Sequence, residues 1–555
     1  MTDGRVCIGV FPDVWYDRQG KLLAALQDLA HVRFQSGRDA AIEDFRFVIL
    51  ANPADELLER ASRCGIRALV YGGAGGPVAG EAGVMAFADR EEIDRSLRGE
   101  QFAEPGGVDQ CILRCYPGDA VLATRAGAPV WVRRYTDGAM SDRVAIEPRP
   151  LGDGELLRER LRANAVSELV PLIQFVREVA GAGDWEQPPP RACFVIDDPS
   201  LYWPSYGYVE FARLAECAAR LGCHVAIATI PLDTWRVHPE VARILSRHAN
   251  HLSLLVHGNN HTHLEMAREE PEDSRRAQFA QALRRFERLR RHPGLQLSRV
   301  VEPPYGVIDG AAARLLASLG YQAMLYTPSQ FIICNRSRPW PTSLGAVPVD
   351  VAPHGLAAIP RLVMSRHWRS EVAIAAFLRQ PIVLAGHHQD FFAGLGLLEK
   401  FSSHVNRLGN VKWLSPAAIA RSLCMTRREG DGWIVRVGAR TIDCEVPAGV
   451  RRLVIERPWV DADGEALEVH RGYAMEQPLR IEGASASHEL SWEGRGSVRV
   501  TLSSPISSPI DPDSVAPPPQ RLWPILRKIM VEGRDRLYPY LPERLVRRLR
   551  ARISC

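Results

Sequence analysis

Two adjacent carboxylates and a group of three histidines are the side chains of this 555-residue chain whose types and spacing best suit chemistry. Asp197 and Asp198 follow directly on an apolar run. Two neighbouring carboxylates ionise together only at a cost unless a cation lies beside them. A second apolar run ends at His257, with His261 and His263 close behind. Histidines four residues apart on a turn present two imidazoles to one side, as a divalent metal requires. We therefore expect a metal centre where the two runs end.

Two more segments end in groups that could take part in a reaction. Residues 302–306 have the sequence EPPYG, in which two prolines and a glycine fix a rigid loop around Tyr305. Another apolar run leads into His387 and His388. An imidazole near neutral pH suits a general acid, so this pair is a candidate for proton transfer.

Apolar strands that alternate with amphipathic helices must position these groups. The sequence predicts strands at 192–196, 225–229, 252–257 and 382–385, and helices at 209–221 and 273–291. Such alternation over 191–423 is typical of a barrel of parallel strands with outer helices. In such barrels the catalytic groups gather at the carboxyl ends of the strands, which is where the carboxylates and histidines fall.

The rest of the chain divides into segments of different character. We expect an open α/β domain with a parallel sheet at 1–150, flavodoxin-like or amidotransferase-like and without an evident active site, because apolar runs alternate with helices there. The other segments are a helical connector with a Pro-rich linker at 151–190, a small antiparallel β-sandwich-like domain at 425–503, a linker at 504–520 and a basic amphipathic tail at 521–555.

Composition and charge exclude several classes of protein. Apolar residues make up 46% of the chain and charged residues 24%, which are ordinary globular values. The formal net charge of +4 does not indicate a nucleic-acid binder. The first residues lack a secretory signal pattern, and no apolar run reaches the roughly 18 residues of a membrane span. We therefore expect a cytoplasmic protein.

The tail at 521–555 departs from this neutral average. It holds ten Lys and Arg residues against three acidic ones, and aromatic and aliphatic residues lie between them. A basic amphipathic helix of this kind suits an anionic membrane surface. The alternative is a helix packed on the protein body with its basic face in water. The first alternative would make the protein peripheral at the inner membrane face.

The order of these groups resembles that of the polysaccharide deacetylase family, carbohydrate esterase family 4, over about 191–423. Ile196-Asp197-Asp198 resembles the first motif of the family, and 257–261, HGNNH, resembles the second. Residues 303–306, PPYG, resemble the third motif, and 383–388 resemble the last. The resemblance implies an irregular (β/α) barrel, here with the open α/β domain before it and the antiparallel β domain after it.

Three positions depart from the pattern of the family. Pro199 stands where the first motif has glycine, and Gly258 stands where the second has serine or threonine. Glu302 replaces the arginine that begins the third motif and orients the base. An acid there would face Asp197 as a like charge and disfavour its ionisation.

The resemblance implies a metal-dependent hydrolase that removes an acetyl or similar acyl group from an amino sugar in a surface or lipid-linked glycan. Asp198, His257 and His261 would hold a divalent metal, with zinc as the expected ion. The metal would polarise the amide and lower the pKa of a water molecule. The groups expected to bind the sugar are Tyr202, Trp203, Tyr305 and His263.

The resemblance also assigns the proton transfers. Asp197 would be the base, and His387 or His388 would protonate the leaving amine. Two other classes stay open. One is a barrel enzyme of different chemistry, a glycosidase or another C–N hydrolase, with Asp197 and Glu302 as its carboxylate pair. The other is a non-catalytic protein that binds or assembles glycans.

Overall fold

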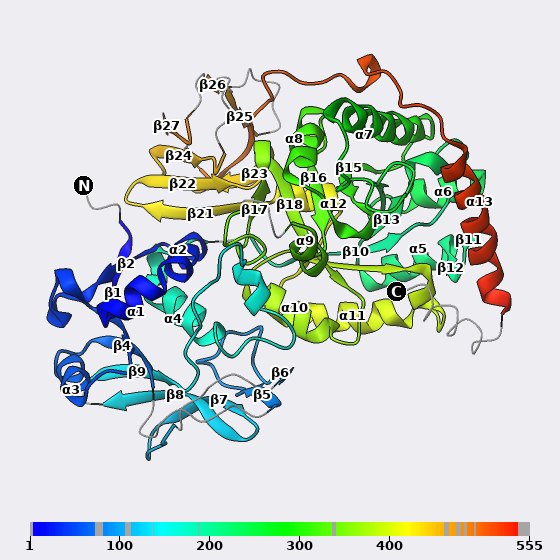
Figure 1. Cartoon of the computed structure of the whole chain (residues 1–555). Coiled ribbons are helices and arrows are strands. Elements are labelled where there is room, and N and C mark those ends of the chain that lie inside the picture. Colours follow the sequence, from blue (N-terminus) through cyan, green and yellow to red (C-terminus); the bar gives the residue numbers. More distant parts are fainter. Residues whose placement is uncertain are drawn as a thin grey trace.

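The structure is a computed structural model, which describes residues 4–72, 82–105, 113–136, 138–186, 188–335, 340–459, 466–472, 479–481, 485–492 and 496–541. A strand-and-helix barrel lies at its centre, with a large sheet from the N-terminal part on one side and two small sheets near it (Figure 1). Part of the basic tail predicted at 521–555, residues 542–555, lies outside the described residues.

Seven parallel strands close the barrel. They are β10 (Arg191–Asp197), β13 (Val225–Thr229), β14 (Leu252–His257), β15 (Leu297–Glu302), β16 (Ala323–Tyr326), β18 (Leu356–Val363) and β19 (Ile382–His387). Each strand pairs with the next in this order, and β10 pairs with both β19 and β13. Every residue of β10, β13 and β14 is buried, which is why these strands appear in the sequence as unbroken apolar runs. The predicted barrel is confirmed.

Helices cover the outside of the barrel and bury one face each on the strands. They are α5 (Phe211–Leu221), α6 (Pro239–Arg247), α7 (Glu272–Glu287), α8 (Gly310–Ser318), α9 (Pro328–Asn335), α10 (Trp368–Phe377), α11 (Gly396–Asn406) and α12 (Pro416–Arg421). Helix α5 is an example, because its buried residues Leu214 and Ala218 lie about one turn apart and so share the face that packs on the barrel. Gly222 ends this helix in the left-handed conformation that glycine adopts most readily.

Two small sheets close the barrel at the end where its strands begin. One sheet contains β21 (Cys424–Glu429), β22 (Gly432–Val437), β24 (Arg452–Glu456) and β27 (Ser487–Ser491); the other contains β23 (Thr441–Val446), β25 (Leu467–Arg471), β26 (Leu479–Ile481) and β28 (Val498–Ser503). One apolar core joins barrel residues such as Val195 and Leu255 to residues of these sheets such as Val435. The carboxyl ends of the barrel strands are therefore the end that remains for a site. The predicted antiparallel β domain is confirmed, although β22 and β24 run parallel.

The N-terminal part forms a nine-stranded sheet that is only half parallel. It consists of β1 (Val6–Phe11), β2 (Val32–Ser36), β3 (Phe47–Ala51), β4 (Arg67–Tyr71), β5 (Gly83–Phe87), β6 (Gln101–Glu104), β7 (Ala120–Arg125), β8 (Ala128–Thr136) and β9 (Ala139–Val144). The first four strands pair in parallel, with α2 (Gly20–Leu29) and α3 (Asp55–Arg63) as connections, but β5 to β9 pair antiparallel with one another. The open α/β fold is confirmed, but the sheet is parallel only in part, because a turn as short as Ala126-Gly127 joins antiparallel neighbours.

The C-terminal helix α13 (Leu522–Leu537) lies at the end of the barrel where its strands finish, near α6 and the hairpin of β11 (Ser205–Tyr206) and β12 (Val209–Glu210), as the red ribbon of Figure 1 shows. Its buried residues are Pro524, Lys528 and Asp535. Its exposed apolar residues are Leu522, Trp523, Ile525, Leu526, Ile529, Met530 and Leu537. The helix thus turns charged groups toward the barrel and apolar groups outward, the reverse of the alternative in which the basic face of a packed helix lies in water.

None of the described helices has the length and hydropathy needed to cross a membrane.

Candidate metal centre

The pairing of the barrel strands brings the candidate groups to one rim. Asp197 ends β10 and is paired with His387, the last residue of β19. His257 ends β14 and is paired with Glu302, the last residue of β15. Because all seven strands run in the same direction, segments far apart in the sequence deliver their polar ends to the same place.

Asp198, His257 and His261 converge on one point. Asp198 Oδ1 lies 3.3 Å from His257 Nε2 and 3.1 Å from His261 Nε2. One ligand atom from each residue falls within 4.8 Å of the others. Asp198 Oδ1 is buried and has no hydrogen-bond partner among the described residues. A buried carboxylate oxygen and two imidazole nitrogens facing one another in this way fit a divalent cation.

The ionisation of these groups also fits a cation. Burial raises the pKa of Asp198, but the nearby His261 and His257 lower it more, and the net result is a pKa well below the usual value. Burial lowers the pKa of His261 to about 4, against the opposing effect of Asp198. The carboxylate is therefore charged and the His261 imidazole neutral at pH 7, which are the forms that bind metals.

The backbone around the histidines is held by two glutamates. The backbone carbonyl of Glu302 accepts hydrogen bonds from His257 Nδ1 at 3.0 Å and from the Gly258 amide at 3.1 Å. A proton on Nδ1 leaves His257 Nε2 free as a ligand. The carboxylate of Glu265, which is buried, accepts from the backbone amides of residues 259–262. Glu265 thus fixes the turn that carries His261, and the sequence analysis did not identify it.

Gly258 is required by the same arrangement. Its φ is +59°, and a Cβ there would lie 2.1 Å from Glu265 Oε1 and 2.7 Å from Pro304 Cγ. A side chain at this position would displace the carboxylate that holds the turn. Glycine at position 258, in place of serine or threonine, therefore leaves room for the carboxylate of Glu265.

Asp197 is buried beside the ligand cluster and paired with an arginine. Arg361 of β18 donates from Nη1 to Asp197 Oδ2 at 2.7 Å and from Nε to Thr327 Oγ1 at 2.9 Å. The same Nη1 contacts the carboxylate of Glu302. Asp197 Oδ1 is buried without a hydrogen-bond partner in the described part of the chain. One carboxylate oxygen is therefore held in place and the other is left for a ligand.

Glu302 lies beside Asp197, and the guanidinium of Arg361 contacts both acids. The exposed fraction of Glu302 is 0%. The like-charge contact expected between the two acids is offset by this arginine, which comes from β18. A fully buried Glu302 also does not fit a role as a group that touches substrate.

The side chains of His387 and His388 lie in different surroundings. His387 is 53% exposed in its side chain, and its Nε2 lies 3.9 Å from Asp197 Oδ2 and from Asp198 Oδ2. His388 is 1% exposed and lies 3.5 Å from Asp535 of α13, with the Tyr206 ring edge-on at 5.1 Å. A group that exchanges protons with substrate has to reach it, so His387 suits that role and His388 does not.

The charged face of α13 forms one wall of the site. Lys528 Nζ lies 2.7 Å from Asp233 Oδ2, and both side chains are buried. Asp535 accepts a hydrogen bond from the Tyr206 hydroxyl at 2.7 Å, and its pKa is lowered, because His388 and Tyr206 outweigh the opposing effect of burial. Without α13, Asp233 and His388 of the barrel would lose these charged partners.

The aromatic residues predicted to bind sugar lie in two places. Tyr202 and Trp203 are on the α13 side, where the guanidinium groups of Arg236 and Arg536 lie over the Trp203 ring. These guanidinium groups lie where a sugar was expected to stack on the Trp203 ring. Tyr305 is exposed and packs against the exposed His263 in an edge-on contact of 4.7 Å. This second pair remains open to solvent beside the ligand turn.

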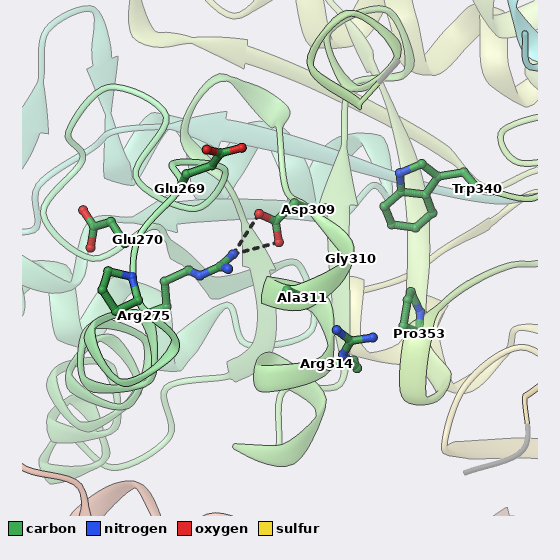
Figure 2. Close-up of a pocket in the computed structure, with 10 residues that line it drawn as sticks. Glu269, Glu270, Arg275, Asp309, Gly310, Ala311, Arg314, Trp340 and Pro353 are labelled. Atoms are coloured by element: carbon green, nitrogen blue, oxygen red, sulfur yellow. Dashed lines mark hydrogen bonds and ion pairs between the residues drawn. The ribbon is translucent and has the colours of Figure 1, made fainter. Parts of the chain in front are cut away.

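A separate cavity of about 630 Å³ opens between the first turns of α7 and α8. Figure 2 shows Arg275 paired with both oxygens of Asp309 in it, with Trp340 across the opening. None of the converging residues lines this cavity.

Comparisons with known proteins give the following likenesses. No protein-family model and no curated protein sequence matches the chain. Among solved structures, Agd3, titled a novel carbohydrate deacetylase, matches with a TM-score of 0.46 and 9% identity over 90% of this chain and 99% of its own. A putative polysaccharide deacetylase from Mycobacterium smegmatis matches with a TM-score of 0.31 and 16% identity over 43% of this chain and 92% of its own.

A 4-alpha-glucanotransferase from Thermococcus litoralis matches with a TM-score of 0.32 and 12% identity over 42% of this chain and 40% of its own. At these TM-scores and identities the likenesses carry no inference about function.

Proposed function

We propose that the chain is a metal-dependent hydrolase that removes an acetyl or similar acyl group from the nitrogen of an amino sugar. The observation that carries this proposal is the convergence of Asp198, His257 and His261 on one point, with Asp197 and His387 beside it. Amide hydrolysis needs an electrophilic catalyst at the carbonyl, a base for the water and an acid for the leaving amine. The rim offers a group for each.

Asp198, His257 and His261 would hold the metal, with zinc as the expected ion for two imidazoles and a carboxylate. A divalent ion there supplies a Lewis acid for the amide carbonyl and makes water a better nucleophile at neutral pH. The donor set supports this assignment, because three ligands leave coordination positions open for water and substrate.

The chain's own residues would move the protons. Asp197 Oδ1, which has no partner among the described residues, accepts the proton of the attacking water, and Arg361 fixes the opposite oxygen. His387, exposed at the rim, delivers a proton to the leaving nitrogen. Tyr305 and His263, which are exposed and in contact with each other, would contact the sugar. A glycosidase that uses Asp197 with Glu302 is disfavoured, because Glu302 is fully buried.

The function is tested with the matched histidine pair. Full-length protein loaded with zinc is incubated with N-acetylated chitooligosaccharides, and released acetate and free amine are measured. We expect His387→Gln to lower kcat by about 10²-fold with metal content unchanged, because general acids typically contribute that much or more. His388→Gln, checked for folding, should affect kcat much less.

Two results would contradict this assignment. A wild-type protein that binds zinc but releases acetate from no N-acetylated glycan would favour the non-catalytic glycan-binding alternative. Equal loss of kcat in both histidine variants would remove the distinction between them.

We further propose that the protein works at an anionic membrane surface, which α13 contacts with its outward apolar face. Arg521, Arg534 and Arg536 accompany the exposed apolar residues, and Trp523 and Tyr540 lie toward the two ends of the segment, as interfacial anchors do. The nine described cysteines are free thiols, which is typical of proteins on the cytoplasmic side. The substrate would then be a glycan carried on a lipid.

Membrane contact is tested by vesicle co-sedimentation. We expect Leu526→Ser/Ile529→Ser to weaken binding to phosphatidylglycerol-containing vesicles at least tenfold, because burying each of these side chains contributes about 1.5–3 kcal/mol. High salt should release the wild type. The control Val363→Ser/Leu479→Ser removes two exposed apolar residues elsewhere and should bind normally. Equal sedimentation of both double variants, or binding unaffected by salt, would contradict the proposal.

A further inference from the structure

A second cavity, of about 610 Å³, lies between the start of α13 and the turn that carries the metal ligand His261. Its lining includes four arginines, Arg268, Arg285, Arg521 and Arg527. Asn260, Thr262 and His263 of the turn also line it, so the cavity adjoins the metal centre.

The positive charge of this cavity exceeds its negative charge, because Glu270 is the one acid among its lining residues. Arg285 donates to the side-chain oxygens of Asn259 and Asn260 at 2.8 Å, and Arg527 donates to the His261 carbonyl at 2.7 Å. These acceptors are neutral. Among the described residues, the only carboxylate in ion-pair contact with the four arginines is Glu270, 4.0 Å from Arg268. Burial and the nearby Arg288 lower the pKa of Arg285, against the opposing effect of Glu265 and Asp233.

The opening of the cavity is apolar on one side. Trp523 and Ile525 line it and also belong to the exposed apolar face of α13. A ligand that fits both surfaces has a multiply charged anion next to a hydrocarbon chain. Arginine clusters bind phosphate through several charge-assisted hydrogen bonds at once.

We propose that this cavity binds the phosphate or diphosphate that joins a glycan to a membrane lipid, a proposal that rests on the amide hydrolase function for the role of the adjoining centre. The anion sits among Arg268, Arg285, Arg521 and Arg527. The hydrocarbon chain passes over Trp523 and Ile525 toward the bilayer, and the sugar extends toward His261.

The first test measures anion binding without turnover. Full-length protein is titrated with inorganic pyrophosphate by calorimetry in the presence of EDTA, so that the probe cannot be bound through a metal. We expect one site per chain and at least a tenfold weaker affinity in Arg268→Gln/Arg521→Gln, with unchanged circular dichroism. The charge-matched control Arg213→Gln/Arg314→Gln should bind as the wild type does. No binding by the wild type, or equal weakening in both double variants, would overturn the proposal.

The second test separates a lipid phosphate from a soluble one. Phosphatidylcholine vesicles doped with a long-chain isoprenyl phosphate should recruit the protein more strongly than vesicles doped with an equal amount of phosphatidylglycerol, and pyrophosphate should displace it. Equal recruitment would overturn the lipid part and assign the cavity to a soluble phosphate-bearing glycan.

These outcomes are distinguishable from failure of the hydrolase function. A chain that binds pyrophosphate in the cavity but hydrolyses no amide refutes the reaction and not the anion site. A chain that hydrolyses N-acetylated glycans but binds no pyrophosphate refutes the anion site and not the reaction.

Discussion

Asp198→Asn is expected to remove stoichiometric metal binding and to lower the rate of N-deacetylation by about 10³-fold or more. The substitution replaces the charged oxygen that lies 3.3 and 3.1 Å from the two imidazole nitrogens by an amide. A bound metal contributes several kcal/mol of transition-state stabilisation, and each 1.4 kcal/mol corresponds to a factor of ten. Metal is measured by elemental analysis of the purified chain, and the rate by release of acetate.

Two controls make this result specific. EDTA-treated wild type should regain activity when zinc is returned, whereas Asp198→Asn should not. Asp273→Asn removes the same charge from an exposed position on α7 and should retain both metal and rate. Full metal content in Asp198→Asn would contradict the assignment of this residue as a ligand.

Arg361→Met is expected to destabilise the barrel by about 3–5 kcal/mol, because it leaves buried carboxylates of Asp197 and Glu302 without their cation. Adding Glu302→Gln should recover part of this loss, since one of the two buried charges is then gone. The midpoint of urea unfolding, followed by tryptophan fluorescence, measures both variants. A midpoint for Arg361→Met equal to that of the wild type would show that the carboxylates do not depend on this arginine.

The sequence alone was sufficient to predict the position of candidate groups that directly follow an apolar run. An aspartate pair or a histidine cluster at the end of an apolar run predicts a place at the rim, because strand direction fixes where the run ends. The strands at Val225–Thr229 and Leu252–His257 were predicted with the bounds that the structure has. The barrel and the antiparallel β domain follow from the same periodicities.

Residues whose role depends on a contact with another strand could not be identified in this way. Arg361 lies in an apolar run, and a single arginine in a buried strand signals only that some acid lies opposite. That the acids are Asp197 and Glu302 depends on the closure of the barrel. Glu265 is likewise one of several acids in its segment, and only the fold of the turn separates it from Glu269 and Glu270.

The orientation of α13 could not be predicted from the sequence either. An amphipathic pattern states that a helix has two faces, and burial normally takes the apolar one. Here Lys528 and Asp535 are buried because the barrel presents Asp233, Tyr206 and His388 as partners. Those partners lie between 147 and 329 residues away in the sequence, and no local pattern indicates them.

The attachment of α13 through its charged face has a consequence for the order in which the site is completed during translation. A ribosome makes His261 266 residues before it makes Arg527, the helix residue that bonds to its carbonyl. Once β19 has been made, all seven barrel strands are present, while Asp233 still lacks Lys528 and His388 still lacks Asp535. The nascent chain therefore carries the three proposed metal ligands before it has the wall beside them. The same helix that completes this wall also adds the apolar face, so the finished site and the proposed membrane contact arise in one step of synthesis.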